Sequence, residues 1–163
     1  MAISVSRSGY TKAIFLPIKA LRNNFNSTKM LFPKKVKFRK SHTRREHPDK
    51  IGNETRGTYV AFGSFGLKAT SAGRIRANCI EAARKAMSRS VSKSGKMWVR
   101  IFPDKPFTQK PAEVKMGKGK GDLAGYEAVI RPGRIMFEID GVDEATAREA
   151  LRKAGTKLPV KTR

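Results

Sequence analysis

The residues best suited to bind a ligand lie in a short stretch of alternating glycine and lysine, MGKGKG at residues 116–121, within what we call the Lys/Gly loop (residues 115–122). Glycines let the backbone approach a ligand closely and expose N–H groups, while Lys118 and Lys120 add mobile positive charge. This combination predicts contact with a phosphate backbone. The same composition also suits a solvated hairpin tip, and the loop alone does not distinguish the two.

Residue types that carry catalysis or bind metals are sparse. There is a single cysteine, Cys79, at an apolar helical position where a small core residue is expected, and the two histidines, His42 and His47, have no zinc-ligand spacing. No Gly-Lys pair is followed by Ser or Thr, so the phosphate-binding loop of nucleotide hydrolases is absent. The sequence therefore predicts no enzymatic activity, no cofactor and no metal, and a lone cysteine favours a reducing compartment.

The charge of the chain predicts a polyanionic partner. Lysine and arginine number 36 against 13 acidic residues, which gives a formal charge of +23 over 163 residues. Nucleic acid is the commonest partner of such a protein, and we expect RNA, not DNA. An acidic protein is an alternative. A membrane is not expected, because no apolar run approaches the ~20 residues of a spanning helix.

The distribution of charge divides the chain into three regions. Residues 1–29 contain no acidic residue and form an extension that could be a transit peptide, a tail or the product of a start codon assigned too early. Residues 30–57 form a basic arm, with aromatic residues interleaved, that we expect to become ordered on RNA. Residues 58–163 have the pattern of a globular domain. The arm residues expected to bind RNA are Lys34, Lys35, Lys37, Arg39, Lys40, Arg44 and Arg45.

The globular region predicts a compact α+β sandwich. It opens with a hairpin of two short strands around residues 59–66, followed by a helix capped by Ser71. One face of this helix is apolar, and the other is expected to contact RNA through Arg74, Arg76, Arg84, Lys85 and Arg89. A strand at 97–102 leads into three prolines, which should end any regular structure before the Lys/Gly loop.

The last part of the chain predicts two strands and a helix. Strands at 126–130 and 135–139 are joined by a tight turn with Pro132 and Gly133 at its centre. A helix at 142–154 has an apolar stripe and charges that complement its dipole, with Gly155 placed as its C-terminal cap.

Seven segments, in order, resemble one known family and together cover nearly all of residues 30–162. They are MLFPKKVKFRK from Met30, AFGSFGLKA from Ala61, IEAARKAM from Ile80, GKMWVRIFPDKP from Gly95, KPAEVKMGKGKG from Lys110, PGRIMFEIDGV from Pro132, and AREAL with KLPVKT near the end. This pattern is similar to the L-sixteen family of bacterial large-subunit ribosomal proteins.

The resemblance implies a hammerhead-type fold, a two-layer sandwich of antiparallel or mixed sheet with two main helices and an extended N-terminal arm. It implies binding to large-subunit rRNA and neighbouring ribosomal proteins, and contact with A-site tRNA, with the P site as a further candidate. The loop expected near tRNA comprises Lys115, Met116, Gly117, Lys118, Gly119, Lys120 and Gly121. Lys115 stands where the family commonly has an arginine that can be hydroxylated, so that modification is not carried over.

The resemblance also implies a cytoplasmic location on the large ribosomal subunit, or a mitochondrial or plastid one if residues 1–29 are a transit peptide. Two other functions remain open on the residues alone. A free RNA chaperone would share the charge but would not need a folded domain presenting one loop. An RNA-modifying enzyme would need a cofactor pocket or a catalytic constellation.

Overall fold

The protein has an α+β fold, as the sequence predicts. A computed structural model describes residues 31–43, 50–91 and 95–163. Within them the elements are β1 (Phe65–Lys68), β2 (Gly73–Arg76), α1 (Ala77–Val91), β3 (Lys96–Val99), β4 (Lys105–Gln109), β5 (Asp122–Ile130), β6 (Ile135–Asp140) and α2 (Glu144–Gly155).

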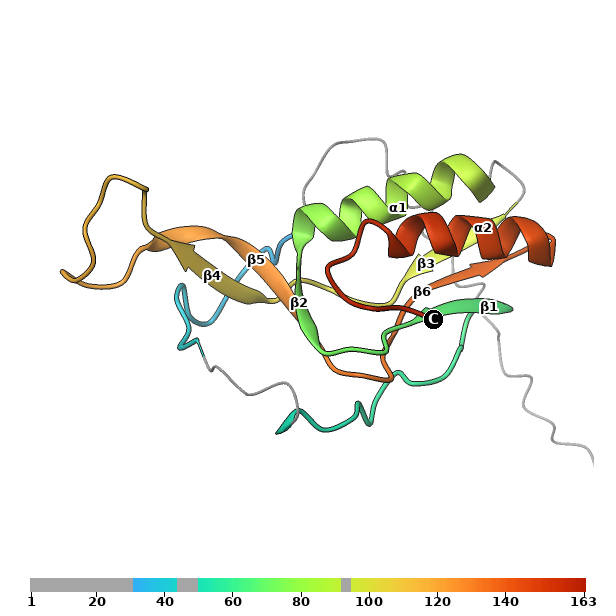
Figure 1. Ribbon diagram of the computed structural model, residues 1–163, viewed down its shortest axis with the longest axis horizontal. Coiled ribbons are helices and arrows are strands. Elements are labelled where there is room, and N and C mark those ends of the chain that lie inside the picture. The colour runs from blue at the N-terminus through green and yellow to red at the C-terminus, as the bar shows by residue number, and fades with distance from the viewer. Residues whose placement is uncertain (1–30, 44–49, 92–94) are drawn as a thin grey trace, which may run out of the picture.

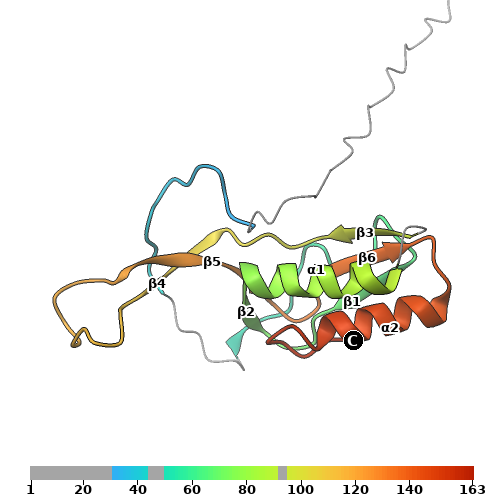
Figure 2. The same ribbon diagram turned by 90° about the horizontal axis from the view of Figure 1, so that it is seen from above.

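The strands form two antiparallel sheets of three strands each. The first has the order β1-β6-β3 and the second the order β2-β5-β4. Figure 1 shows α1 and α2 lying side by side over one face of the first sheet, while β4 and β5 extend away from the helices as a ribbon that ends in the Lys/Gly loop. The view from above in Figure 2 shows the same separation between the helical body and the ribbon.

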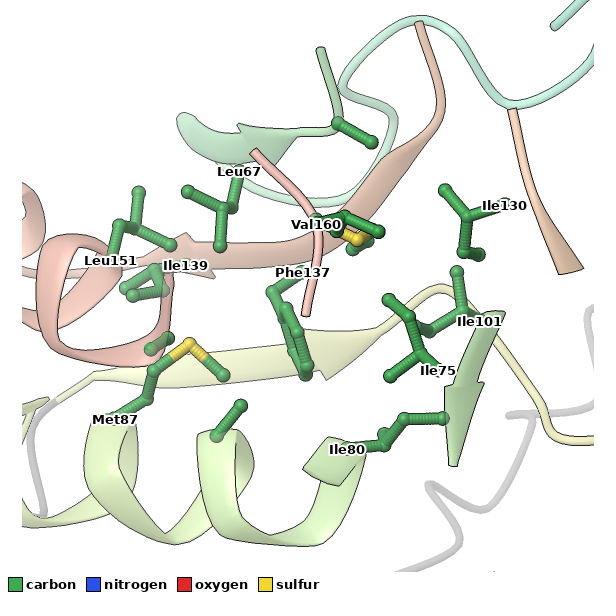
Figure 3. Close-up of a cluster of buried hydrophobic side chains, with 14 of the residues drawn as sticks. Leu67, Ile75, Ile80, Met87, Ile101, Ile130, Phe137, Ile139, Leu151 and Val160 are labelled. Carbon is green, nitrogen blue, oxygen red and sulfur yellow. The ribbon is translucent and has the colours of Figure 1, made fainter. Parts of the chain in front are cut away.

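The hydrophobic core lies between the first sheet and the two helices. Phe137 and Ile139, two residues apart on the central strand β6, therefore point to the same face, toward Ile80 and Met87 of α1 and Leu151 of α2 (Figure 3). Phe137, Ile139, Ile80 and Met87 are fully buried. The two helices contact each other, and the buried positions of both include alanines, whose small side chains permit close packing: Ala83 in α1, and Ala147, Ala150 and Ala154 in α2.

A buried carboxylate lies on the opposite face of β6. Glu138 is 0% exposed and accepts hydrogen bonds from the backbone N–H groups of Ala61 (3.2 Å), Phe62 (2.7 Å) and Gly63 (3.1 Å). The guanidinium of Arg100, just beyond β3, forms an ion pair with the same carboxylate. These contacts hold residues 58–64 against the face of the sheet that the helices leave uncovered.

The hydrogen bonds also decide the charge state of Glu138. Burial by itself would raise its pKa, but the donors at Phe62, Ala61, Arg100 and Gly63 favour the carboxylate and hold the pKa below its ordinary value of 4.5. The side chain is therefore charged at neutral pH. A buried carboxylate with four donors is stable in this position, because its lone pairs are satisfied.

The predicted hairpin around residues 59–66 is wrong. Only β1 is a strand, and it pairs with β6, while the N–H groups of residues 61–63 donate to the side chain of Glu138 on the same strand. Gly63 approaches β6 so closely that a Cβ atom would lie 2.5 Å from the carbonyl oxygen of Ile139. The glycine thus permits close packing and does not form a hairpin turn.

The predicted start of the first helix is also wrong. The helix begins at Ala77, and residues 73–76 form β2, which pairs with β5. Arg74, Ile75 and Arg76 therefore belong to a strand, in which Ile75 faces the core and the arginines flank it on the other side. Ser71 is not a helix cap, and its hydroxyl accepts a hydrogen bond from the N–H of Lys161 at 2.8 Å.

The later elements match the sequence more closely. The expectation that the prolines end regular structure is wrong for Pro106, which lies within β4, an edge strand, the place in a sheet where proline is tolerated. The turn at Pro132 and Gly133 is present, and Gly133 has φ 99°, but the strands that it joins belong to different sheets.

Helix α2 confirms the predicted charge pattern but not its predicted end. Asp143 caps the N-terminus, and its carboxylate accepts from the N–H of Ala145, while Glu144 pairs with Arg148 and Glu149 pairs with Lys153 at four-residue spacing. The C-terminal cap is Thr156, and Gly155 is the last helical residue. A Cβ at Gly155 would lie 2.6 Å from the hydroxyl of Thr162, so this glycine makes room for the end of the chain, where Thr162 forms a β-bridge with Ala69.

We predict that Glu138→Ala lowers the free energy of unfolding by roughly 3–5 kcal/mol, because it leaves Arg100 and three N–H groups without their acceptor. Urea unfolding followed by the fluorescence of Trp98, the single tryptophan, measures the change. Glu149→Ala breaks an exposed ion pair in α2 and should have a much smaller effect. Equal unfolding midpoints for the two variants would contradict this role of Glu138.

The pH dependence of unfolding provides a second measurement. Because the folded-state pKa of Glu138 is lowered, its stabilisation is fully present above the ordinary value of 4.5 and is lost as the pH falls through the lower folded value. Glu138→Gln cannot titrate and should show a shallower loss of stability below pH 4.5 than the unsubstituted protein. Parallel curves in this range would rule out the carboxylate as the titrating group.

Candidate nucleic-acid interface

The Lys/Gly loop lies at the tip of the ribbon formed by β4 and β5. Residues 111–120 are all exposed, and Met116 is 91% exposed. Three consecutive residues have left-handed backbones, Gly117 (φ 96°), Lys118 (φ 50°) and Gly119 (φ 92°). Two of the three positions are glycine, which adopts this conformation without strain. The predicted exposed turn is therefore present, and its shape depends on the glycines.

The loop encloses a concave, basic surface. An open concavity of about 650 Å³ is lined by Lys110, Lys115, Lys118 and Lys120, with Asp122 at its edge. Lys110 extends across the base of the loop and donates to the carbonyl oxygen of Gly117. A concave surface with several lysines and exposed glycine backbone has the chemistry that binds phosphate oxygens.

The structure brings the basic arm to the base of this loop. The ammonium of Lys40 lies 3.4 Å from the carbonyl oxygen of Lys120 and 3.5 Å from the carboxylate of Asp122, and Lys120 in turn donates to the carbonyl oxygen of Ser41. The hydroxyl of Ser41 donates to the carbonyl of Pro106 at 3.4 Å. Figures 1 and 2 show the blue arm crossing the ribbon near β4. Two predicted sites about 80 residues apart thus form one surface.

Most of the described arm cations are exposed. Lys34, Lys35, Lys37 and Arg39 are exposed, and Lys40 is half-buried against the ribbon. The ammonium of Lys37 lies 5.4 Å from the centre of the Phe38 ring, and that ring is itself 66% exposed. Arg44 and Arg45 lie outside the described residues.

The two arginines of β2 contact the second sheet. Arg74 forms an ion pair with the buried Glu127 at 3.3 Å, and the guanidinium of Arg76 lies 4.8 Å from the centre of the Phe107 ring on β4. Arg76 is still exposed, and it lies at the body end of the ribbon. The prediction that both lie on a basic helix face is wrong, because they lie in the sheet that carries the Lys/Gly loop.

Three predicted residues remain on α1. Arg84 and Glu81, three residues apart, form two hydrogen bonds of 2.9 and 2.6 Å, and this contact with Arg84 lowers the pKa of Glu81. Lys85 and Arg89 are exposed. The helix therefore presents Lys85 and Arg89 to solvent, while the charge of Arg84 is offset by Glu81.

Three linked arginines, Arg56, Arg100 and Arg134, are not among the residues that the sequence predicts for the site. Arg134 follows the turn at Pro132 and donates to the carbonyl oxygens of Arg56 (2.8 Å) and Arg100 (3.4 Å). The alternation of Trp98 and Arg100 predicts that both lie on one face of a strand, but nothing in the sequence indicates that residues 56–62 cover that face.

Other kinds of site find little support in the described part of the chain. It contains no group of three or more histidine, cysteine or acidic side chains placed to hold a metal. Among the same residues, no helix has the length and apolar character needed to cross a bilayer. Cys79 is half-buried and packs against the core, as expected for a structural residue.

Comparison with known proteins identifies the family. The profile of the family described as "Ribosomal protein L16p/L10e" matches residues 33–163. Proteins named "Large ribosomal subunit protein uL16" from two strains of Leptospira biflexa serovar Patoc are each 58% identical over 133 residues, which cover 82% of this chain and 94% of the relative. The match over residues 33–163 and the identity over most of the chain show that the chain belongs to the ribosomal protein L16p/L10e family.

Proposed function

We propose that this protein is a structural constituent of the large ribosomal subunit that binds large-subunit rRNA and has no enzymatic activity of its own. The Lys/Gly loop is proposed to contact tRNA near the A site, with the P site as a further candidate. Neighbouring ribosomal proteins are the other proposed partners. The location follows the ribosome, in the cytoplasm or in an organelle, and residues 1–29, which would decide between them, lie outside the described residues.

The proposal rests mainly on the hydrogen bonds between the arm and the ribbon. Lys40 and Lys120 reach across to each other's segments, so the arm cations and the loop cations lie on one continuous surface. A surface of this kind can follow a phosphate backbone over several nucleotides. RNA suits it better than an acidic protein, because flexible lysines and exposed glycine N–H groups match closely spaced phosphates.

Family membership supports the ribosomal setting, and the chemistry of the surface supports RNA as the ligand. The arm is proposed to become ordered on rRNA, because its charge density disfavours a packed structure in isolation. Limited proteolysis within residues 34–45 tests this step. Rapid cleavage in the free protein and protection in the assembled subunit are expected, whereas equal protection in both states would contradict it.

A free RNA chaperone is the remaining alternative, and fractionation of cell extracts separates the two functions. We expect the protein to co-sediment with the large subunit and to stay with it in moderate salt. A chaperone would be found mainly in the fractions without ribosomes.

The central test is the salt dependence of RNA binding. The isolated protein should bind structured RNA with an affinity that falls steeply as potassium chloride rises, with a log–log slope of about −0.7 to −0.9 for each phosphate neutralised. Filter binding or fluorescence anisotropy at several salt concentrations gives the slope. Binding that stays constant over a tenfold change in salt would contradict the electrostatic basis of the proposal.

We predict that Lys85 and Arg89 contribute to RNA binding more than Arg84. The double variant Lys85→Ala/Arg89→Ala should reduce the magnitude of the salt slope by roughly 1–2, because it removes two exposed charges. The matched variant Glu81→Ala/Arg84→Ala removes an ion pair of zero net charge and should leave the slope nearly unchanged. Equal slopes for both variants would show that this helix face does not contact RNA.

We predict that the charge of the Lys/Gly loop serves tRNA binding and not stability. Lys115→Gln/Lys118→Asn removes two exposed charges, and asparagine tolerates the left-handed backbone at position 118. The melting temperature should stay within about 2 °C, as for other surface substitutions. Ribosomes that contain normal amounts of the variant should bind aminoacyl-tRNA more weakly.

The control for this variant is Lys157→Gln/Lys161→Gln, which removes the same charge near the C-terminus, away from the loop (Figure 1). It should leave tRNA binding at the unsubstituted level. If both double variants translated at the parental rate across a range of salt, the loop would be only a solvated hairpin tip.

A further inference from the structure

Two aromatic side chains are exposed on the sheet face that the helices leave uncovered. Tyr59 is 70% exposed and Phe62 is 59% exposed, and both belong to the segment 58–64 that Glu138 fixes in place. This segment lies on the side of the first sheet away from α1 and α2 (Figure 1). The core does not account for these rings, since most of their surface remains in contact with solvent.

Phe62 is held more firmly than an ordinary surface side chain. Its N–H donates to Glu138 at 2.7 Å, and the N–H groups on either side of it donate to the same carboxylate. Its ring stacks on Trp98, with 6.2 Å between the ring centres and 24° between the planes. The guanidinium of Arg100 lies 4.8 Å from the centre of the same ring. The protein thus fixes both the backbone and the ring, and leaves more than half of the side chain open.

The surroundings of Phe62 are rich in arginine. Arg100 contacts the ring, Arg134 donates to the carbonyl of Arg100, and Arg134 also donates to the carbonyl of Arg56. The two nearby acids are already engaged, because Glu138 pairs with Arg100 and Asp140 accepts from the hydroxyl of Ser64 at 2.7 Å. The local charge therefore favours an anionic ligand beside the ring.

We propose that Phe62 is a stacking platform for an unpaired base of RNA, with Trp98 and the guanidinium of Arg100 holding the ring in place. Aromatic rings and guanidinium planes are the groups on which proteins stack single-stranded bases, and here a ring and a guanidinium are already assembled without the ligand. An apolar side chain of a neighbouring protein could also cover a ring, but it would make no use of the guanidinium that lies against the same ring. This inference rests on the proposed RNA-binding function and adds a specific contact to it.

The experiment uses the full-length protein and a short oligoadenylate that carries one 2-aminopurine, whose fluorescence is quenched when it stacks on an aromatic ring. Three variants are compared with the unsubstituted protein. Phe62→Leu keeps an apolar side chain but removes the ring, Phe62→Trp keeps a stacking surface, and Phe102→Leu removes another exposed phenylalanine outside the platform. An abasic ribose-phosphate oligomer of the same length separates base contacts from phosphate contacts.

We expect Phe62→Leu to weaken oligoadenylate binding by about 5-fold to 150-fold and to abolish the corresponding quenching, in line with the usual contribution of one base–aromatic stack. Phe62→Trp should retain both, Phe102→Leu should behave like the unsubstituted protein, and all proteins should bind the abasic oligomer equally. The unfolding midpoint of Phe62→Leu, measured in parallel, shows that the protein is folded.

The outcomes separate this inference from the proposed function. Salt-dependent binding that is the same for Phe62→Leu and the unsubstituted protein would overturn the platform and leave RNA binding intact. If Phe62→Leu also failed to incorporate into large subunits, the ring would be a contact with another protein, which again overturns the platform. Failure of the unsubstituted protein to bind either oligomer at low salt would overturn both.

Discussion

The carboxylate of Glu138 is the interaction on which the arrangement of this domain depends. It lies on the central strand of the first sheet and directs three N–H groups of residues 61–63 and the guanidinium of Arg100 to one point. Arg100 is linked through its carbonyl to Arg134, and Arg134 is linked to the carbonyl of Arg56. Since Arg134 follows the turn between β5 and β6, this chain of contacts runs from the middle of one sheet to the point where the polypeptide crosses into the other. A neutral residue at position 138 could fill the same space, but it could not accept all of these donors at once.

The crossing at Pro132 and Gly133 explains how a small domain carries a long ribbon. β6, which follows the turn, is buried between β1 and β3 under the helices. β5, which precedes the turn, pairs with β2 and β4 in the second sheet. The ribbon needs no apolar surface at its tip, because the body supplies the core. Its far end can therefore consist of lysine and glycine without loss of packing, and substitutions in the Lys/Gly loop are separated from the residues that stabilise the fold.

The sequence predicts the elements whose pattern is long and regular, and it fails where neighbouring patterns overlap. Helix α2 and strands β5 and β6 follow from their apolar spacing. Strand β2 was missed because its four residues run directly into α1, so that Ile75 and Cys79, four residues apart, fit a helical spacing across the boundary. Pro106 predicts the end of a regular element, although an edge strand tolerates proline. In the candidate site, the composition of the Lys/Gly loop was sufficient to find it. Its contact with the arm depends on residues about 80 positions apart, and the role of Glu138 depends on three backbone groups that have no sequence signature.

The net charge of +23 overstates the number of cations that are available to a ligand, because some cations pair with groups of the protein itself. Arginine and lysine differ in this respect. Arg74, Arg84 and Arg100 each pair with a glutamate of the protein, because a planar guanidinium can bridge a carboxylate and a neighbouring ring or carbonyl in a fixed direction. The exposed cations of the Lys/Gly loop are lysines, as are most of those in the described part of the arm. Lysine is a compact charge on a flexible stem, so it can follow a phosphate path that varies in detail, whereas a fixed arginine cannot. The domain therefore uses several of its arginines to hold its own surfaces in place, while exposed lysines of the arm and the Lys/Gly loop, such as Lys34, Lys35 and Lys118, keep the freedom to adapt to RNA.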